Sequence, residues 1–273
     1  MTVPIVSGFA ELNGARIYYE LAGEGPPLVL LHAGVADSRQ WNGEFERFSR
    51  QFRVLRYDLR GYGKSEPVPG DFNHLQDLTA LLGHLKLEEP VILMGCSMGG
   101  GIAMDFALEH SSRVRAIVMV GSAPSGLALD VPAPAKFEEI DRAYALADYE
   151  RVAELRTQLW FDGQGRAPNQ VDPEMRRLAL DMNRVVLRHE TKQLGKRLPN
   201  AYLPAVQRLT QVSQPLLVIV GEHDTPYLRA AAAYMASHVP TARQHTMADA
   251  AHLPNLDHPE LFQQIVGSFL STL

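Results

Sequence analysis

The chain has 273 residues, of which 46% are hydrophobic and 21% are charged, a composition typical of globular proteins. Its formal net charge of −5 disfavours a nucleic-acid or anionic-membrane partner, and its single cysteine, Cys96, excludes an internal disulfide and a cysteine-cluster metal site. No signal peptide and no apolar run of membrane-spanning length is visible, so we expect a cytoplasmic protein.

The first part of the chain alternates between strand-like and helical patterns. Two short β-like runs are separated by Asn13-Gly14, a dipeptide that strongly favours a hairpin. Residues 27–32 are almost continuously apolar, as expected of a strand that is buried on both faces. The elements predicted up to residue 85 are strands over 9–12, 16–21, 27–32 and 52–57 and helices over 38–50 and 74–85, the second with Asn73 as its N-cap.

The stretch from 91 to 104 predicts a buried strand, a sharp turn and a helix. The turn is Gly95-Cys96-Ser97-Met98-Gly99, a G-x-S-x-G motif in the structural context that gives this motif its meaning. Gly95 and Gly99 fit because any Cβ at those positions would crowd the helix against the strand. Ser97 would then present its hydroxyl at the end of the sheet, beside the N-terminus of a helix that favours an anion.

A long block without strand-like runs interrupts the second half of the chain. A strand is predicted over 115–120, and residues 127–212 then show helical periodicity punctuated by prolines. Strands alternating with helices predict a parallel sheet with helices on both faces, and the helical block is expected to be an insertion over one edge. The elements predicted after the insertion are strands over 215–220 and 242–247 and helices over 227–237 and 260–273.

Three chemically apt residues follow predicted strands in the order nucleophile, acid and base. They are Ser97, Asp224 and His252. A serine hydroxyl is a weak nucleophile at neutral pH, so it needs a base within reach, and the base needs a third group to fix its tautomer. In parallel sheets the carboxyl ends of the strands meet at one edge, so these three side chains could converge there.

With these motifs the chain resembles the α/β-hydrolase fold superfamily over essentially its whole length. The family usually has His-Gly where this chain has His32-Ala33, a departure that leaves Gly34 in place. The segments that carry the resemblance are His32-Ala33-Gly34, residues 58–65, Gly95-Cys96-Ser97-Met98-Gly99-Gly100, Gly221-Glu222-His223-Asp224 with Pro226, and Ala251-His252-Leu253-Pro254-Asn255. Within the superfamily the chain looks most like the 3-oxoadipate enol-lactonase and esterase branch.

The resemblance implies both a fold and a set of roles. The fold is α/β, with a mostly parallel eight-stranded sheet flanked by helices and a helical cap inserted after the sixth strand. The core would comprise residues 1–126 and 213–273, and the cap residues 127–212. Ser97 would be the nucleophile, His252 the base and Asp224 the acid. The backbone N–H groups of Gly34 and Met98 would form the oxyanion hole.

Other residues receive weaker assignments. Asp249 and Asp257 are alternative acids, although roles in a solvated loop suit them better, and His223 is expected to be structural. Asp58 and Arg60 are expected to tie a loop together by an ion pair, and His32 to hold the oxyanion loop. Candidate substrate-pocket residues are Val35, Trp160, Met182 and Leu253.

These features predict a serine hydrolase that cleaves a small carboxylic ester or lactone through an acyl-enzyme, without a cofactor or a metal. We expect a small-molecule substrate and neither a nucleic-acid nor a membrane partner. The alternatives are a cofactor-free haloperoxidase or perhydrolase, a C–C bond hydrolase on the same fold, and a non-catalytic ligand receptor. The oligomeric state is left open.

Overall fold

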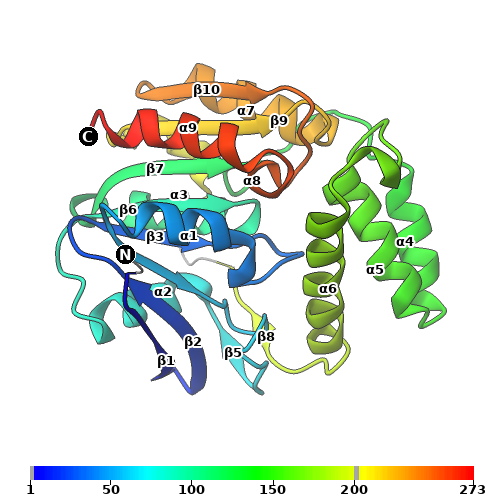
Figure 1. Cartoon of the computed structure of the whole chain (residues 1–273), viewed down its shortest axis with the longest axis horizontal. Helices are drawn as coiled ribbons and strands as arrows, with labels where there is room; N and C mark the ends of the chain where they lie inside the picture. Colours follow the sequence, from blue (N-terminus) through cyan, green and yellow to red (C-terminus); the bar gives the residue numbers. More distant parts are fainter. Residues whose placement is uncertain (1–2, 200–202) are drawn as a thin grey trace.

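One mostly parallel sheet forms the centre of the computed structural model, which describes residues 3–199 and 203–273 (Figure 1). Within these residues, eight strands are ordered β1-β2-β4-β3-β6-β7-β9-β10. The β1–β2 and β2–β4 pairs are antiparallel, and the other neighbours are parallel. The strands are β1 (Ile5–Leu12), β2 (Ala15–Ala22), β3 (Pro27–Leu31), β4 (Arg53–Tyr57), β6 (Val91–Cys96), β7 (Val114–Val120), β9 (Leu216–Gly221) and β10 (Ala242–Met247). The predicted α/β-hydrolase architecture is therefore confirmed.

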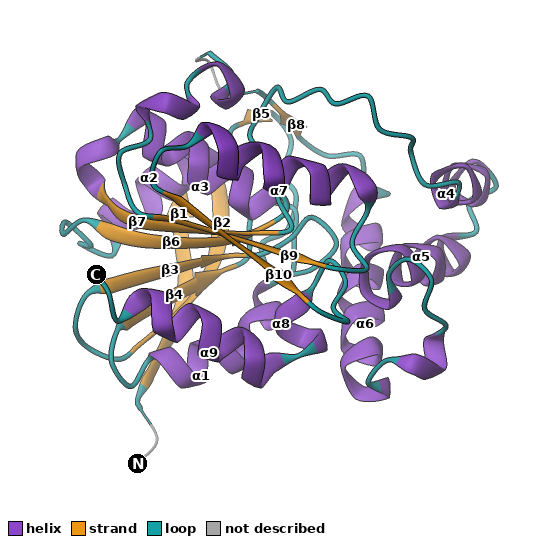
Figure 2. Ribbon diagram, turned by 90° about the horizontal axis from the view of Figure 1, so that it is seen from above, coloured by secondary structure: helices purple, strands orange, loops and turns teal. Residues whose placement is uncertain are grey.

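Helices cover both faces of this sheet (Figure 2). In β3, Val29 and Leu31 join one apolar cluster, whereas Leu28 and Leu30 join another, because successive side chains point to opposite faces. The first cluster includes residues of α2 (His74–His84), α3 (Met98–Glu109) and α7 (Pro226–His238), and the second residues of α1 (Asn42–Phe48), α8 (Pro254–Asp257) and α9 (Pro259–Leu270). The central strands are thus buried on both sides, as their apolar runs predict.

Local sequence signals fix several element boundaries. Asn13 and Gly14 have φ values of 48° and 77°, and they connect β1 to β2. The Asn73 side chain accepts hydrogen bonds from the N–H groups of Leu75 and Gln76, so it caps α2 as predicted. The predicted helix over 38–50 begins instead as a 3₁₀ turn, Ser38–Trp41, before α1.

The segment between β7 and β9 lies beyond one end of the sheet (Figure 1). It contains α4 (Lys136–Ala145), α5 (Tyr149–Thr157), a π-helical turn at Gln158–Asp162 and α6 (Pro173–Glu190). These elements share a small apolar cluster that is separate from the two clusters on the sheet. The two-residue strand β8 (Lys196–Arg197), which pairs with β5 (Asp71–Phe72), was not predicted, because both of its residues are charged.

The helices are short or amphipathic. In the ranges 3–199 and 203–273, none combines the length and the apolar character that crossing a bilayer requires.

Candidate active site

The sharp turn between β6 and α3 holds Ser97 in a strained conformation. Its φ of 51° and ψ of −113° are rarely adopted by a residue with a side chain, and such a conformation costs on the order of 1–3 kcal/mol. The Ser97 N–H donates to the Val120 carbonyl at 2.8 Å, and the Ser122 hydroxyl donates to the Ser97 carbonyl at 2.7 Å. The end of neighbouring β7 and the residues directly after it therefore hold the backbone of Ser97 through both its N–H and its carbonyl group.

The glycines of this turn are required by close backbone contacts. A Cβ added at Gly95 would lie 2.3 Å from the backbone of Gly99, and one at Gly99 would lie 2.3 Å from the carbonyl oxygen of Leu31. Both contacts are far inside van der Waals distance and involve backbone atoms, which cannot move aside easily. The sequence argument that a Cβ would crowd this turn is confirmed.

His252 and Asp224 form a buried pair at the same end of the sheet. Asp224 follows β9 and His252 lies in the loop after β10, and His252 Nδ1 donates to Asp224 Oδ2 at 2.9 Å. The Asp224 carboxylate also accepts a hydrogen bond from the Thr225 N–H at 2.7 Å. Because a carboxylate only accepts, the proton lies on Nδ1, and Nε2 of the neutral ring is left as an acceptor.

Ser97 and His252 line the same cavity, which has a volume of about 360 Å³. Gly34, Val35 and Met98 line its wall, and the segment between β7 and β9 contributes Trp160 among others. Among the described residues the structure records no hydrogen bond between the Ser97 hydroxyl and His252, and such contacts are often long until substrate binds. The structure therefore brings the predicted nucleophile and base to one cavity.

Gly34 and Met98 approach each other beside Ser97. Met98 is the first residue of α3, and the N–H of a first helical residue has no acceptor within its helix. A Cβ built at Gly34 would lie 3.8 Å from the Met98 Cβ, so the two backbones are in close proximity. This placement would allow the backbone N–H groups of Gly34 and Met98 to donate hydrogen bonds to one substrate oxygen atom.

His32 holds the loop that carries Gly34. Its buried ring donates from Nδ1 to the Ala33 carbonyl at 2.8 Å and accepts at Nε2 from the Leu59 N–H at 3.0 Å. Burial lowers the pKa of His32, which keeps the ring neutral and lets Nε2 accept. His32 thus serves the loop, as expected from the sequence.

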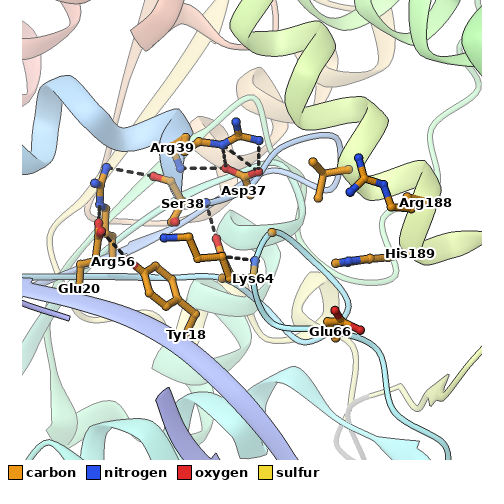
Figure 3. A pocket seen from close by; sticks show the side chains of 13 residues that line it. Tyr18, Glu20, Asp37, Ser38, Arg39, Arg56, Lys64, Glu66, Arg188 and His189 are labelled. Carbon is orange, nitrogen blue, oxygen red and sulfur yellow. Dashed lines mark hydrogen bonds and ion pairs between the residues drawn. The ribbon is translucent and has the colours of Figure 1, made fainter. Parts of the chain in front are cut away.

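A second cavity of about 370 Å³ lies beside the same loop and is lined largely by charged side chains (Figure 3). In it, Arg39 pairs with Asp37 at 2.7 Å. The buried Asp58 carboxylate accepts from the backbone N–H groups of Ser38 and Lys64 at 2.8 and 2.7 Å. These contacts anchor the segment that follows Gly34 and Val35 in the chain.

The expected ion pair between Asp58 and Arg60 is wrong. Arg60 instead pairs with Asp77 of α2 at 2.7 Å, with both side chains buried, while Asp58 binds backbone N–H groups. Although Asp58 and Arg60 are only two positions apart, their side chains bind different partners and connect their loop to different parts of the molecule.

The alternative acids lie away from His252 Nδ1. Asp257 pairs with Arg166 at 2.6 Å, and the exposed Asp249 carboxylate lies 3.3 Å from Nε2 of His223. The second nitrogen of His223, Nδ1, contacts the Gln164 carbonyl at 2.9 Å. The geometry therefore favours Asp224 as the partner of His252.

Cys96 precedes the nucleophile position but is fully buried. Its thiol contacts the His252 carbonyl oxygen at 3.6 Å, and burial raises its pKa to about 12. A thiol in this state is a poor nucleophile.

The candidate pocket residues separate into two groups. Val35 and Trp160 line the cavity that contains Ser97. The pocket assignment of Met182 and Leu253 needs correction, because both side chains are almost completely buried in the apolar cluster on the sheet and neither lines this cavity. These two apolar side chains pack in the interior instead of facing the cavity.

Sequence reasoning missed several residues at the site: Gly121, and the cavity-lining residues Phe137, Ile140, Asp141, Arg156 and Glu190. A Cβ at Gly121, whose φ is 49°, would lie 2.8 Å from His252 Nδ1 and 3.0 Å from Asp224 Oδ2, so only glycine fits there. The position of Gly121, directly after the apolar strand β7, could have indicated that the chain makes a close approach there. Arg156 and Glu190 line the cavity from α5 and α6, and no motif marked them.

Comparison with known proteins places the chain among hydrolases. The family model described as the alpha/beta hydrolase fold matches residues 26–259. A curated relative, the pimeloyl-[acyl-carrier protein] methyl ester esterase of Nitrosomonas europaea, is 31% identical over 260 residues, covering 91% of this chain and 97% of the relative.

Two solved structures share the fold at lower identity. The enol-lactonase from Burkholderia xenovorans LB400 has a TM-score of 0.78 and 23% identity, covering 97% of this chain and 100% of the other. The bromoperoxidase from Bacillus anthracis has a TM-score of 0.80 and 23% identity, with the same coverage of 97% and 100%.

Proposed function

Because this chain belongs to the α/β-hydrolase fold family, we propose that it is a serine hydrolase that cleaves a small carboxylic ester or lactone through an acyl-enzyme. The observation that carries the proposal is the meeting of Ser97, on its strained turn, with the buried His252–Asp224 pair at one cavity. The relative that is named for a methyl ester supports ester chemistry.

In the proposed mechanism, His252 Nε2 removes the proton of the Ser97 hydroxyl as its oxygen attacks the carbonyl carbon. Asp224 holds the imidazole in the required tautomer and stabilises its charged form. The N–H groups of Gly34 and Met98 bind the oxygen that becomes negative, and each such donor contributes about 3 kcal/mol. His252 then protonates the leaving alcohol, and the same groups activate water to release the acid.

We propose further that residues 127–212 act as a cap over the core formed by 1–126 and 213–273. Six residues of this segment line the cavity with Ser97 and support this assignment, namely Phe137, Ile140, Asp141, Arg156, Trp160 and Glu190. A cap of this kind limits the access of bulk water to the site and shapes the pocket for the substrate. A cytoplasmic location stays a prediction from the sequence.

The alternative functions differ in what they require of this site. A C–C bond hydrolase needs polar donors around an extended anion, and the residue before the nucleophile, Cys96, is buried with a raised pKa. Perhydrolysis would use the same three residues, Ser97, Asp224 and His252. It is tested by assaying wild type and Ser97→Ala with hydrogen peroxide and acetate. A receptor would need neither the strained Ser97 nor the buried His252–Asp224 pair.

The test is a panel of p-nitrophenyl esters and small lactones, assayed with wild type and Ser97→Ala. We expect kcat to fall by about 10⁶ in the variant, as in other serine triads. A fluorophosphonate probe should label wild type at Ser97 and leave the variant unlabelled. Because the hydroxyl faces the cavity, circular dichroism should show an unchanged fold. Equal activity of the two proteins would refute the assignment.

A further inference from the structure

The cavity that contains Ser97 has an apolar part and a charged part. Val35, Met98 and Trp160 lie with Ser97 and His252, and Phe137 and Ile140 of α4 extend the apolar wall. The charged side chains that line the cavity all come from the insertion: Asp141 of α4, Arg156 of α5 and Glu190 at the end of α6. The charged side chains of the lining would contact a polar group of the substrate other than the scissile ester.

The single cation of this lining is already paired. Arg156 Nη1 lies 3.0 Å from Glu190 Oε2, with the two side chains 18% and 35% exposed. Within the part of the chain that the structure describes, Asp141 makes no ion pair. One positive and two negative charges thus leave this part of the cavity with a net negative charge.

A substrate carboxylate would be repelled at this position. To pair with Arg156 it would have to compete with Glu190, while Asp141 adds a second like charge, and like charges in a partly enclosed site cost more than they do in bulk water. A carboxylate-bearing lactone, such as 3-oxoadipate enol-lactone, is therefore poorly matched to this cavity.

An uncharged amide is matched much better. Arg156 retains N–H donors beyond the one that contacts Glu190, and the Glu190 carboxylate retains accepting capacity. The carbonyl of an amide can accept from Arg156 while its N–H donates to Glu190, and neither ionic group loses its partner. Hydrogen bonds to charged groups are stronger than those between neutral groups.

We infer that the cavity selects esters whose acyl chain carries an uncharged polar group, of the amide type, and disfavours chains that end in a carboxylate. The inference rests on the proposed hydrolysis at Ser97, and it assigns Arg156, Glu190 and Asp141 as specificity-determining residues for that reaction.

The test compares two ligands of equal length, monomethyl adipate and the methyl ester of adipic acid monoamide, which differ in a carboxylate and a carboxamide. Turnover by wild type is measured as methanol release, and binding to Ser97→Ala, which retains the pocket, is measured by titration calorimetry. We expect a preference of about tenfold for the amide in both kcat/KM and affinity, equivalent to about 1.4 kcal/mol.

Substitutions assign the preference to the named residues. Glu190→Gln should reduce the preference to about threefold or less, and Asp141→Asn, at the exposed edge of the cavity, should reduce it without disturbing the ion pair. The matched control is Glu150→Gln. Glu150 pairs with Arg184 at 2.8 Å and likewise links α5 to α6, but it does not line this cavity, so the preference should stay at about tenfold.

Equal or tighter binding of the carboxylate ligand, or failure of the amide ligand to bind, would overturn the inference. So would a preference that Glu150→Gln alters as much as Glu190→Gln and Asp141→Asn do. Binding with the expected preference but without turnover by wild type would instead refute the proposed hydrolysis and leave the selectivity of the cavity standing.

Discussion

The indole ring of Trp160 lies against the imidazole ring of His252, with the two ring centroids 4.5 Å apart. Trp160 belongs to the π-helical turn Gln158–Asp162 of the insertion, whereas His252 belongs to the loop after the last strand of the sheet. π-Helical turns are rare and occur frequently at functional sites. The contact makes the orientation of the proposed base depend on a segment that is not part of the sheet.

Removal of this ring should therefore weaken catalysis. Trp160→Ala deletes both a wall of the cavity and the surface against which His252 packs, and we expect kcat/KM to fall by about 10- to 100-fold, because small displacements of catalytic groups are costly. Trp160→Phe keeps an aromatic ring there and should retain most of the activity. Steady-state kinetics with one p-nitrophenyl ester measures both, and full activity of Trp160→Ala would contradict the prediction.

The identity of the acid can be tested by two amide substitutions. Asp224→Asn should lower kcat by about 10⁴, by analogy with serine proteases, because the amide favours the wrong imidazole tautomer. Asp249→Asn should leave kcat nearly unchanged, since its carboxylate is exposed and lies near His223. Loss of activity in the second variant with retention in the first would show that we have chosen the wrong acid.

Gly121 offers a test of positioning by a residue that contributes no side chain. Gly121→Ala places a methyl group 2.8 Å from His252 Nδ1, so the imidazole must shift, and we expect about a 10²-fold loss of kcat. Gly101→Ala is the matched control. Gly101 lies in α3, and its added Cβ would meet the Ala123 carbonyl oxygen at 3.8 Å, an ordinary contact, so activity should persist and stability should rise by up to about 1 kcal/mol. Thermal unfolding and kinetics of both variants provide the comparison.

Glu44 makes stability depend on pH. Its buried carboxyl group accepts hydrogen bonds from Asn255 at 2.9 Å and Gln263 at 3.3 Å, but burial dominates and raises its pKa from 4.5 to about 7. The folded state therefore binds a proton that the unfolded state releases between these two values. Stability present at acidic pH is lost as the pH rises through about 7, by about 3 kcal/mol in total.

Urea unfolding at several pH values between about 4 and 8 measures this dependence. Glu44→Gln should flatten the fall in unfolding free energy across that window. Glu46→Gln changes an exposed carboxylate on the same helix and should keep the wild-type profile. A Glu44→Gln profile as steep as that of wild type would show that another group is responsible.

Much of the fold follows from local patterns in the sequence. Apolar runs located the buried strands of the sheet, and Asn13-Gly14 and Asn73 marked a turn and a helix start that the structure reproduces. The tight turn around Ser97 was likewise predictable, because the contacts that exclude a Cβ at Gly95 and Gly99 arise within one strand–turn–helix unit and its neighbouring strand.

The wrong sequence predictions concern the partners of side chains and the surfaces that they contact. Asp58 and Arg60 are two positions apart, yet one binds backbone N–H groups and the other pairs with Asp77. Leu253 follows His252 directly and Met182 lies in the helical segment between β7 and β9, yet both apolar side chains pack in the interior. Hydrophobic periodicity indicates that a residue is buried but does not indicate which surface it is buried against.

The sequence by itself therefore determined the sheet, the strained nucleophile turn and the chain order of Ser97, Asp224 and His252, because these depend on local conformation and on strands that end at one edge. Only the tertiary structure decided what surrounds them. Arg156 and Glu190 reach the cavity through the packing of the segment between β7 and β9, and no local pattern encodes where a helix distant in the chain will lie. The residues proposed for catalysis are thus recognisable from short sequence motifs, whereas the residues proposed for substrate selectivity are brought to the cavity by contacts between distant segments.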